Sequence, residues 1–475
     1  MKARFLFILL LYIATIFNFE LKADNTPKNI AIINVTIIPM NKELVLHDQT
    51  IVIENGKIKQ IGDASKIKLP ANCKTIDGKG KYLVPGFFDM HAHFFYEQGN
   101  NVNTCEAELK MMLANGLTTV RIECGDSVYL DARQKVKTHQ WLGPDLSVSS
   151  PQFVGNYPWE GKVFAKICKT PNEAVVAVKQ CKKEGYDEIK ITFMVKRDVY
   201  DAIIKTAKEE GIKVTGHVGP LVKLPAALAA KQQIEHMDEF IDMLLPDTTY
   251  NHGQSVSDMN IWRKKAWATV PYLDESKIPS LVKSVKDAGI YVTPTNYFFY
   301  SSFADSISKD EYMARPDYQY IPIAIKKERW EIREYYWKNP PPAASRKKYI
   351  DTRNKIVYEL NKAGVKLMAG SDSPEWFLVQ GFSIHDELET FARAGLSPYS
   401  ILQTVTINPA SYLGVNKIKG TIETGKDADL ILLDKNPLDN ISNTRSINTI
   451  IKGATTFDKA GLEKLLAEAK EVLSK

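Results

Sequence analysis

The chain has 475 residues, a formal net charge of +6, and 44% hydrophobic and 25% charged residues, which is an ordinary globular composition. Its basic residues are scattered rather than gathered into a stripe, which argues against a nucleic-acid partner. This length accommodates one large domain with a smaller one, or two to three domains.

The N-terminus has the pattern of a secretory signal peptide. Lys2 and Arg4 form a basic segment, residues 5–17 are apolar, and Ala23 offers a small residue for cleavage. The apolar run is shorter than the about 20 residues that span a bilayer, so we expect no stable membrane anchor. We predict that residues 1–23 are removed near Ala23 and that the mature chain is exported to the periplasm or secreted.

The five cysteines are an odd number, and none of them forms a CxxC pair. Export permits disulfides, but at least one thiol is then unpaired or bonded elsewhere. The sequence therefore signals no cysteine metal site and leaves the disulfide pairing open.

Short stretches rich in Ile and Val occur near both ends of the chain, broken by Asn-Gly and Asp-Gly turns. They are residues 30–40, 49–62, 74–86, 419–438 and 447–458. We expect the two ends to pair into one small β-sandwich, formed by residues 28–83 together with residues 411–457. A C-terminal helix is expected over residues 458–475.

The middle of the chain alternates strand-like runs with helix-like segments that are followed by glycine, as helix C-termini often are. The strand-like runs are residues 84–93, 116–123, 145–150, 186–193, 212–218, 232–237, 289–295 and 365–372. Eight strand–helix repeats favour an α/β fold, a (β/α)8 TIM barrel over residues 84–410. In such a barrel, functional residues lie at the C-terminal ends of the strands.

Polar side chains gather at these predicted strand ends. His91 and His93 are two residues apart, so both face the same side of a strand. The other strand-end residues are Lys190, His217, His236 and Asp372. A single histidine at a strand end is usually structural, but four histidines and an aspartate at one barrel mouth favour a metal site, and these ligands suit zinc.

Lys190 lies between Ile189 and Ile191 and faces the opposite side of the strand. An exposed lysine on an alternating strand is the simpler interpretation. Helices cover the outside of a barrel, however, so Lys190 is expected to point inward, where its charge needs a partner.

These motifs together resemble the amidohydrolase superfamily, and within it the exported imidazolonepropionase-like and prolidase-like members. The resemblance covers nearly the whole mature chain. Its motifs are PGFFDMHAH, GLTTVR, GYDEIKI, VTGHV, IEHM, AGSDS, TINPASYLGV and GTIETGKDADLILLDKNPL.

The resemblance implies two divalent metal ions, with zinc expected. His91 and His93 would bind the more buried ion, and His217 and His236 the more exposed one. Lys190, carboxylated by carbon dioxide, would bridge the two ions.

Asp372 would contact the buried ion and the attacking water, acting first as general base and then as general acid. The metals would lower the pKa of a bridging water, which makes hydroxide available near neutral pH.

Two details depart from or extend the family pattern. Single-metal deaminases of the superfamily carry a glutamate three residues after the strand-five histidine, whereas Pro220 stands there in this chain. This departure argues against base deamination. His385, in the segment FSIHDEL, is interpreted as a structural residue rather than a ligand.

Long segments between His236 and Asp372 predict binding loops or lids, and most of their aromatic residues are expected to pack. Tyr157 and Tyr297 are predicted to contact a small-molecule substrate through their hydroxyl groups.

Three functions remain open at this point. The first is hydrolysis of an amide bond in a dipeptide, such as an Xaa-Pro peptide, or in an N-acyl amino acid. The second is hydrolysis of cyclic amides, lactones or organophosphate-like esters, with one metal as an option. The third, a non-catalytic metal-stabilised binding protein, is disfavoured by the intact ligand set. The sequence leaves the oligomeric state open, with a homo-oligomer as one option.

Overall fold

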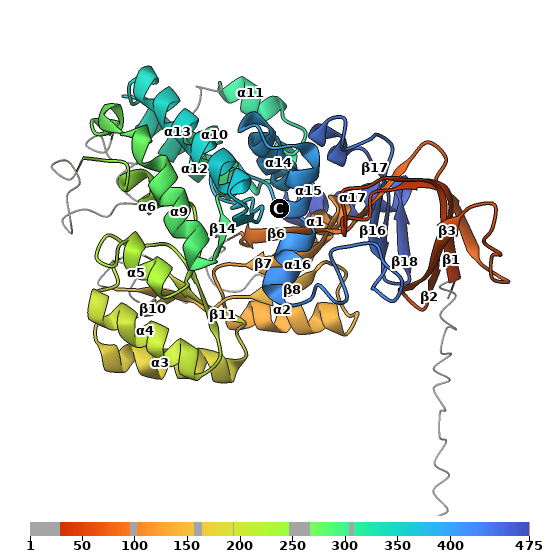
Figure 1. Ribbon diagram of the computed structural model, residues 1–475, viewed down its shortest axis with the longest axis horizontal. Coiled ribbons are helices and arrows are strands. Elements are labelled where there is room, and N and C mark those ends of the chain that lie inside the picture. The colour runs from red at the N-terminus through yellow and green to blue at the C-terminus, as the bar shows by residue number, and fades with distance from the viewer. Residues whose placement is uncertain are drawn as a thin grey trace, which may run out of the picture.

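The computed structural model describes residues 29–95, 102–155, 164–192, 194–246, 267–303 and 308–474. The predicted signal peptide and Tyr157 lie outside these ranges. The chain has a mixed α/β fold that contains a parallel sheet (Figure 1). No helix in the described ranges is long and apolar enough to cross a membrane.

One eight-stranded sheet takes strands from both ends of the chain, and Figure 1 shows the red N-terminal strands beside the blue C-terminal ones. Its order is β18-β17-β16-β5-β1-β2-β3, with β4 paired to β1. These strands are β1 (Asn29–Ile37), β2 (Leu46–Glu54), β3 (Lys57–Asp63), β4 (Lys74–Asp77), β5 (Tyr82–Pro85), β16 (Asp429–Leu433), β17 (Ile447–Lys452) and β18 (Thr455–Asp458).

The two ends meet where β5 pairs antiparallel with β16, Val84 opposite Ile431. Buried Ile30, Ile53 and Leu430 pack in the same apolar cluster, so burial of side chains from both ends holds the sheet together. The predicted Asn-Gly turn joins β2 to β3, because Asn55 and Gly56 both have positive φ, 49° and 77°.

The middle of the chain supplies parallel strands in two groups. One has the order β6-β7-β8 and the other β10-β9-β11-β12-β13-β14-β15. Their bounds are β6 (Phe87–Ala92), β7 (Leu117–Ile122), β8 (Asp145–Val148), β9 (Gln152–Val154), β10 (Ala165–Ile167), β11 (Glu188–Ile191), β12 (Lys213–Gly216), β13 (Gln233–Glu235), β14 (Tyr291–Thr293) and β15 (Lys366–Leu367). Strands β9 and β10 lie outside the runs predicted from sequence.

Isolated bridges connect the two groups of strands at both edges. Ser149, just after β8, bridges to Glu188 in β11. Ala92 in β6 bridges to Ser373, downstream of β15, and the Met90 N–H donates to the Ala369 carbonyl at 2.9 Å. The strand that begins the series is thereby hydrogen-bonded to the segment that ends it.

Helices follow most of these strands along the chain. They are α1 (Val102–Ala114), α2 (Ser127–Lys137), α3 (Pro171–Glu184), α4 (Arg197–Glu209), α5 (Leu224–Ala229), α6 (Asp238–Asp242), α9 (Ile278–Ala288), α13 (Ala343–Lys362), α14 (Ser383–Arg393), α15 (Pro398–Thr404), α16 (Ile407–Leu413) and α17 (Lys459–Leu473). Short 3₁₀ turns are η1 (Val270–Tyr272), η2 (Glu275–Lys277), η3 (Tyr318–Tyr320) and η4 (Ile441–Arg445).

Helix α3 illustrates why these segments are helical. Thr170 and Glu173 form a reciprocal capping box at its start, and Pro171 occupies the first turn. Gly185 ends the helix in the left-handed conformation at φ 92°, which a glycine adopts without steric cost.

The segment after β14, one of those predicted as a binding loop or lid, is not a loop but largely helical. It forms α10 (Asn296–Phe303), α11 (Lys309–Ala314) and α12 (Ile323–Trp337). No glycine occurs between Gly289 and Gly364, and a Ser308–Glu311 capping box starts α11. Its aromatic residues pack as expected, with the Trp330 and Phe377 ring centroids 4.5 Å apart.

His385 connects the parallel strand region to the end of the chain. Its Nδ1 lies 2.9 Å from the Thr444 hydroxyl in η4, and its Nε2 lies 3.1 Å from the Asn115 carbonyl beyond α1. Burial, reinforced by Arg445, lowers the pKa of His385 to about 3. These contacts agree with the structural role expected from the sequence.

We predict that His385 makes the chelator-treated protein sensitive to acid. The ring stays neutral in the folded chain down to about pH 3, whereas the unfolded chain protonates it below about pH 6.5. Its stabilising contribution is therefore present above about pH 6.5 and is lost as the pH falls, at about 1.4 kcal/mol per pH unit. Urea unfolding between about pH 6 and pH 4 should give a shallower pH slope for His385→Gln. An unchanged slope would contradict this assignment.

Candidate metal centre

Parallel strands bring the predicted ligands to one edge of the sheet. His91 lies in β6 and His93 directly follows it. His217 follows β12, and His236 follows β13. Asp372 lies five residues beyond the end of β15, in the segment that is hydrogen-bonded to β6. Because the carboxyl ends of parallel strands share one edge, residues far apart in sequence converge there.

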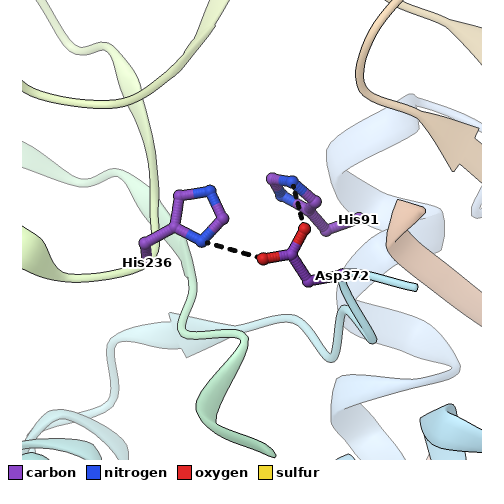
Figure 2. A group of neighbouring side chains, drawn as sticks. All are labelled: His91, His236 and Asp372. Atoms are coloured by element: carbon purple, nitrogen blue, oxygen red, sulfur yellow. Dashed lines mark ion pairs between the residues drawn. The ribbon is translucent and has the colours of Figure 1, made fainter. Parts of the chain in front are cut away.

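Asp372 lies at the centre of the group. Its Oδ1 is 3.4 Å from His91 Nε2 and 3.3 Å from His93 Nε2, and its Oδ2 is 3.5 Å from His236 Nδ1. Figure 2 shows the carboxylate between the His91 and His236 rings, with one oxygen turned toward each. The half-buried His217 ring stacks on His236 with a centroid separation of 4.2 Å.

The buried imidazoles are held in their neutral form. Burial, helped by the charge of Lys190, lowers the pKa of His91 well below its usual value. Burial likewise lowers the pKa of His93 to about 4 and that of His236 well below its usual value. Neutral imidazole is the form that binds a metal ion, so the protein maintains these rings ready to act as ligands.

Three residues at this edge have backbone conformations that are uncommon for residues other than glycine. The φ angles are 65° at His236, 45° at Thr295 and 56° at Asp372. Each such residue costs about 1–3 kcal/mol, and such strain gathers at functional sites. His236 Nδ1 lies 2.8 Å from the Thr295 hydroxyl, so two of the strained residues contact each other.

Asp89 fixes β6 against the segment that carries Asp372. Its Oδ1 accepts the N–H groups of His91 at 3.1 Å and Ser371 at 3.0 Å, and its Oδ2 accepts the Ser371 hydroxyl at 2.6 Å. Burial raises the pKa of Asp89 to about 6. The relative position of His91 and Asp372 is therefore set by hydrogen bonds as well as by strand pairing.

Of the two tyrosines predicted to contact substrate, only Tyr297 can be placed. It lies half-buried in α10, and its N–H donates to Glu387 Oε2 at 2.6 Å. Glu387 Oε1 also accepts the Asn296 N–H at 2.8 Å, which fixes the chain just after β14. The substrate role of Tyr297 stays a prediction, as does that of Tyr157, which lies outside the described ranges.

Lys190 points inward, and its buried amine meets a carboxylate. Its Nζ lies 2.9 Å from Glu123 Oε2, just after β7. Arg121, which lies two residues before Glu123, is fully buried. It forms ion pairs with Glu123 at 2.7 Å, Glu188 at 3.0 Å and Glu235 at 2.7 Å.

This buried network was not predicted from the sequence. The sequence does carry a signal for the network. In both GLTTVRIE and YDEIKI, two charged residues stand two positions apart on a strand that is otherwise mostly apolar.

The donor set fits a divalent ion. Ligand atoms of His91, His236 and Asp372 all lie within 4.8 Å of one another, and so do those of His91, Glu123 and Glu235. Neutral imidazole nitrogens with carboxylate oxygens are the ligands that zinc prefers among protein side chains. These residues would therefore hold such an ion without a change of protonation at the imidazoles.

Curated relatives match mostly over short stretches. A dihydroorotase of Staphylococcus epidermidis is 39% identical over 80 residues, which are 17% of this chain and only 18% of the relative. An imidazolonepropionase of Thermoplasma acidophilum is 22% identical over 420 residues, covering 84% of this chain and 85% of the relative.

Solved structures share the fold over most of the chain. A protein assigned as a prolidase from Bifidobacterium longum has a TM-score of 0.65 at 22% identity, covering 94% of this chain and 99% of its own. A Xaa-Pro dipeptidase with methionine in its active site has a TM-score of 0.65 at 19% identity, covering 90% and 100%.

The sequence model of the amidohydrolase family matches residues 82–456, which include every predicted metal ligand and most of the β-rich C-terminal segment. This match confirms the resemblance inferred from the motifs. The chain belongs to the amidohydrolase family.

Proposed function

We propose that the chain is an exported hydrolase that cleaves a carbon–nitrogen amide bond of a small substrate, with two divalent metal ions. The substrate class is a dipeptide, such as an Xaa-Pro peptide, or an N-acyl amino acid. One observation carries the metal-dependent hydrolysis in this proposal: neutral His91 and His236 converge on Asp372 at the strand ends of an amidohydrolase-family chain.

The fold proposed for this activity is a (β/α)8 barrel over residues 84–410, with a β-sandwich from residues 28–83 and 411–457 and a C-terminal helix. The parallel strands β6, β7, β8 and β11 to β15 support the barrel, as do the bridges at Ser149 and Ala92. The sheet shared by both ends of the chain supports the second domain.

In the proposed site, His91 and His93 would hold one ion, and His217 and His236 the other. Lys190, as a carbamate, would contribute an anionic ligand to both. Its ammonium loses a proton, the nitrogen bonds to the carbon of carbon dioxide, and a second proton leaves the nitrogen. The burial of Lys190 and its inward direction support this role. Zinc is the expected ion, given the histidine-rich donor set.

When bound, the two ions would lower the pKa of a water molecule so that hydroxide is available near neutral pH. The chain's own contribution centres on Asp372, which would accept a proton from the attacking water and donate it to the leaving amine. The position of the Asp372 carboxylate supports this transfer, since Oδ1 faces His91 and Oδ2 faces His236. The Asp89 and Thr295 contacts hold the surrounding groups in place.

A cationic side chain near the same site supports a substrate with a carboxylate. Arg329 Nη1 in α12 is buried and has no hydrogen-bond partner among the described residues. The Arg329 guanidinium carbon lies 5.8 Å from the ring centre of Phe95, which is two residues beyond His93. Glu375 interacts electrostatically with both Arg329 and His93. Burial and Asp372 raise its pKa, while His93 and Arg329 oppose that rise. A terminal carboxylate bound by Arg329 would leave the amide bond toward the metal ligands.

Hydrolysis of cyclic amides, lactones or organophosphate-like esters, with a single metal as one option, is the second candidate. It is favoured by the three-residue group His91, His236 and Asp372, which would hold one ion without Lys190. The likeness to a dihydroorotase and an imidazolonepropionase points in the same direction.

We predict that His217→Ala removes the more exposed ion. Elemental analysis should find about one ion fewer per chain than in the wild type, and kcat/KM for a dipeptide should fall at least about 100-fold because the hydroxide is no longer supplied. His47→Ala, which removes an exposed histidine in β2, is the matched control and should change neither quantity. Unchanged metal content and activity in His217→Ala would show that the site assignment is wrong.

We predict that Arg329→Met selectively weakens substrates with a free carboxylate. A lost charge-assisted pair corresponds to about 1.5–3 kcal/mol, so KM for a dipeptide should rise about 10- to 100-fold. The same peptide capped as a C-terminal amide should be affected less than about threefold. Lys327→Met, an exposed position on the same helix, serves as the control. Equal losses on the free and capped peptides would rule out a carboxylate anchor.

A further inference from the structure

Glu123 is a buried carboxylate whose oxygens accept no hydrogen bond from the described residues. Its charge is balanced by Lys190 Nζ at 2.9 Å and Arg121 Nε at 2.7 Å. The Arg121 Nε–H, however, donates to the Met90 carbonyl at 2.7 Å. Glu123 is therefore compensated in charge but not in hydrogen bonding, which is costly for a carboxylate removed from water.

The Glu123 carboxylate lies beside a predicted metal ligand. Its oxygen, a nitrogen of His91 and an oxygen of Glu235 all lie within 4.8 Å of one another. Of the two carboxylates, Glu235 is already fully engaged, because it contacts His91 Nδ1 at 2.8 Å, Arg121 at 2.7 Å and Thr215 at 2.8 Å. Glu123 is thus the member of this group with unused acceptor capacity.

Carboxylation of Lys190 would change what Glu123 faces. The ammonium 2.9 Å away would be replaced by a neutral nitrogen bearing an anionic group. Two anions in a buried site repel strongly, and a divalent cation between them removes the repulsion. The same replacement leaves Glu123 without one of its two cationic neighbours.

We propose that Glu123 is a ligand of the metal ion held by His91. When Lys190 is carboxylated, that ion would take the place of the Lys190 ammonium as the cation facing the Glu123 carboxylate. This inference rests on the proposed two-metal function and adds a ligand, in the residue that follows β7, that the family motifs do not supply. Glu235 keeps a separate role, since its contact with His91 Nδ1 leaves His91 Nε2 facing Asp372.

The test compares zinc binding by the wild type, Glu123→Gln and Glu188→Gln, with chelator competition for the dissociation constants. Glu188→Gln is the matched control, because Glu188 is buried and pairs with the same Arg121 at 3.0 Å but is absent from both ligand groups. Carbon-13 NMR with labelled carbon dioxide reports the carbamate independently. We expect Glu123→Gln to weaken one of two ions about 100-fold or more with the carbamate signal retained, and Glu188→Gln, which disturbs the same Arg121 network without removing a proposed ligand, to weaken binding at least about tenfold less.

The outcomes separate this inference from the proposed function. Two ions in the wild type with equally tight binding in Glu123→Gln would overturn the ligand role and leave the proposed function standing. A wild type without zinc would overturn both. Loss of the carbamate signal in Glu123→Gln with zinc in sufficient excess to fill both sites would show that Glu123 only orients Lys190, which also overturns the proposal.

Glu123→Asp covers the case in which the glutamine variant does not fold. It keeps the charge opposite Arg121 but shortens the side chain, so the same ion should be weakened about tenfold. Wild-type zinc affinity in Glu123→Asp, with circular dichroism confirming the fold, would count against the ligand role.

Discussion

The ion pairs of Arg121 are the constraint on which the site depends. Its fully buried guanidinium joins Glu123, Glu188 and Glu235, and its Nε–H binds the Met90 carbonyl. These partners lie in or just after β6, β7, β11 and β13, so one side chain ties four strands together. Removing one partner from such a network costs about 3–5 kcal/mol, because an uncompensated charge is left buried. The network also positions two predicted ligands, because Glu235 contacts His91 and Glu123 pairs with Lys190.

The edge of the sheet that carries the predicted ligands is locally destabilised in the folded chain. Backbone strain at His236 and Asp372, together with desolvated imidazoles that stay neutral, raises the free energy of the folded chain without metal. An ion that binds only the folded chain would add stability that grows with the logarithm of its concentration once this exceeds the dissociation constant. The arrangement is that of a site preorganised for a ligand, since strain and dehydration precede binding.

Much of the site could be predicted from sequence because strand geometry is simple. The two-residue spacing of His91 and His93 and the parallel strand order place the predicted ligands at one edge. The Arg121 network could not be predicted, because its pairs join residues 67 and 114 positions apart in sequence. Helices α10 to α12 were mistaken for a loop because their aromatic-rich sequence lacks a clear apolar period. Arg329 could not be predicted either, since its position beside Phe95, two residues after His93, depends on how α12 packs.

The central claim is a two-metal centre at the strand ends, and the most direct test is the metal content of the protein purified without chelators. Elemental analysis should find two divalent ions per chain, with zinc expected. A single ion would contradict the bridge at Lys190 and favour the one-metal alternative. A chain with no bound metal would contradict the account as a whole.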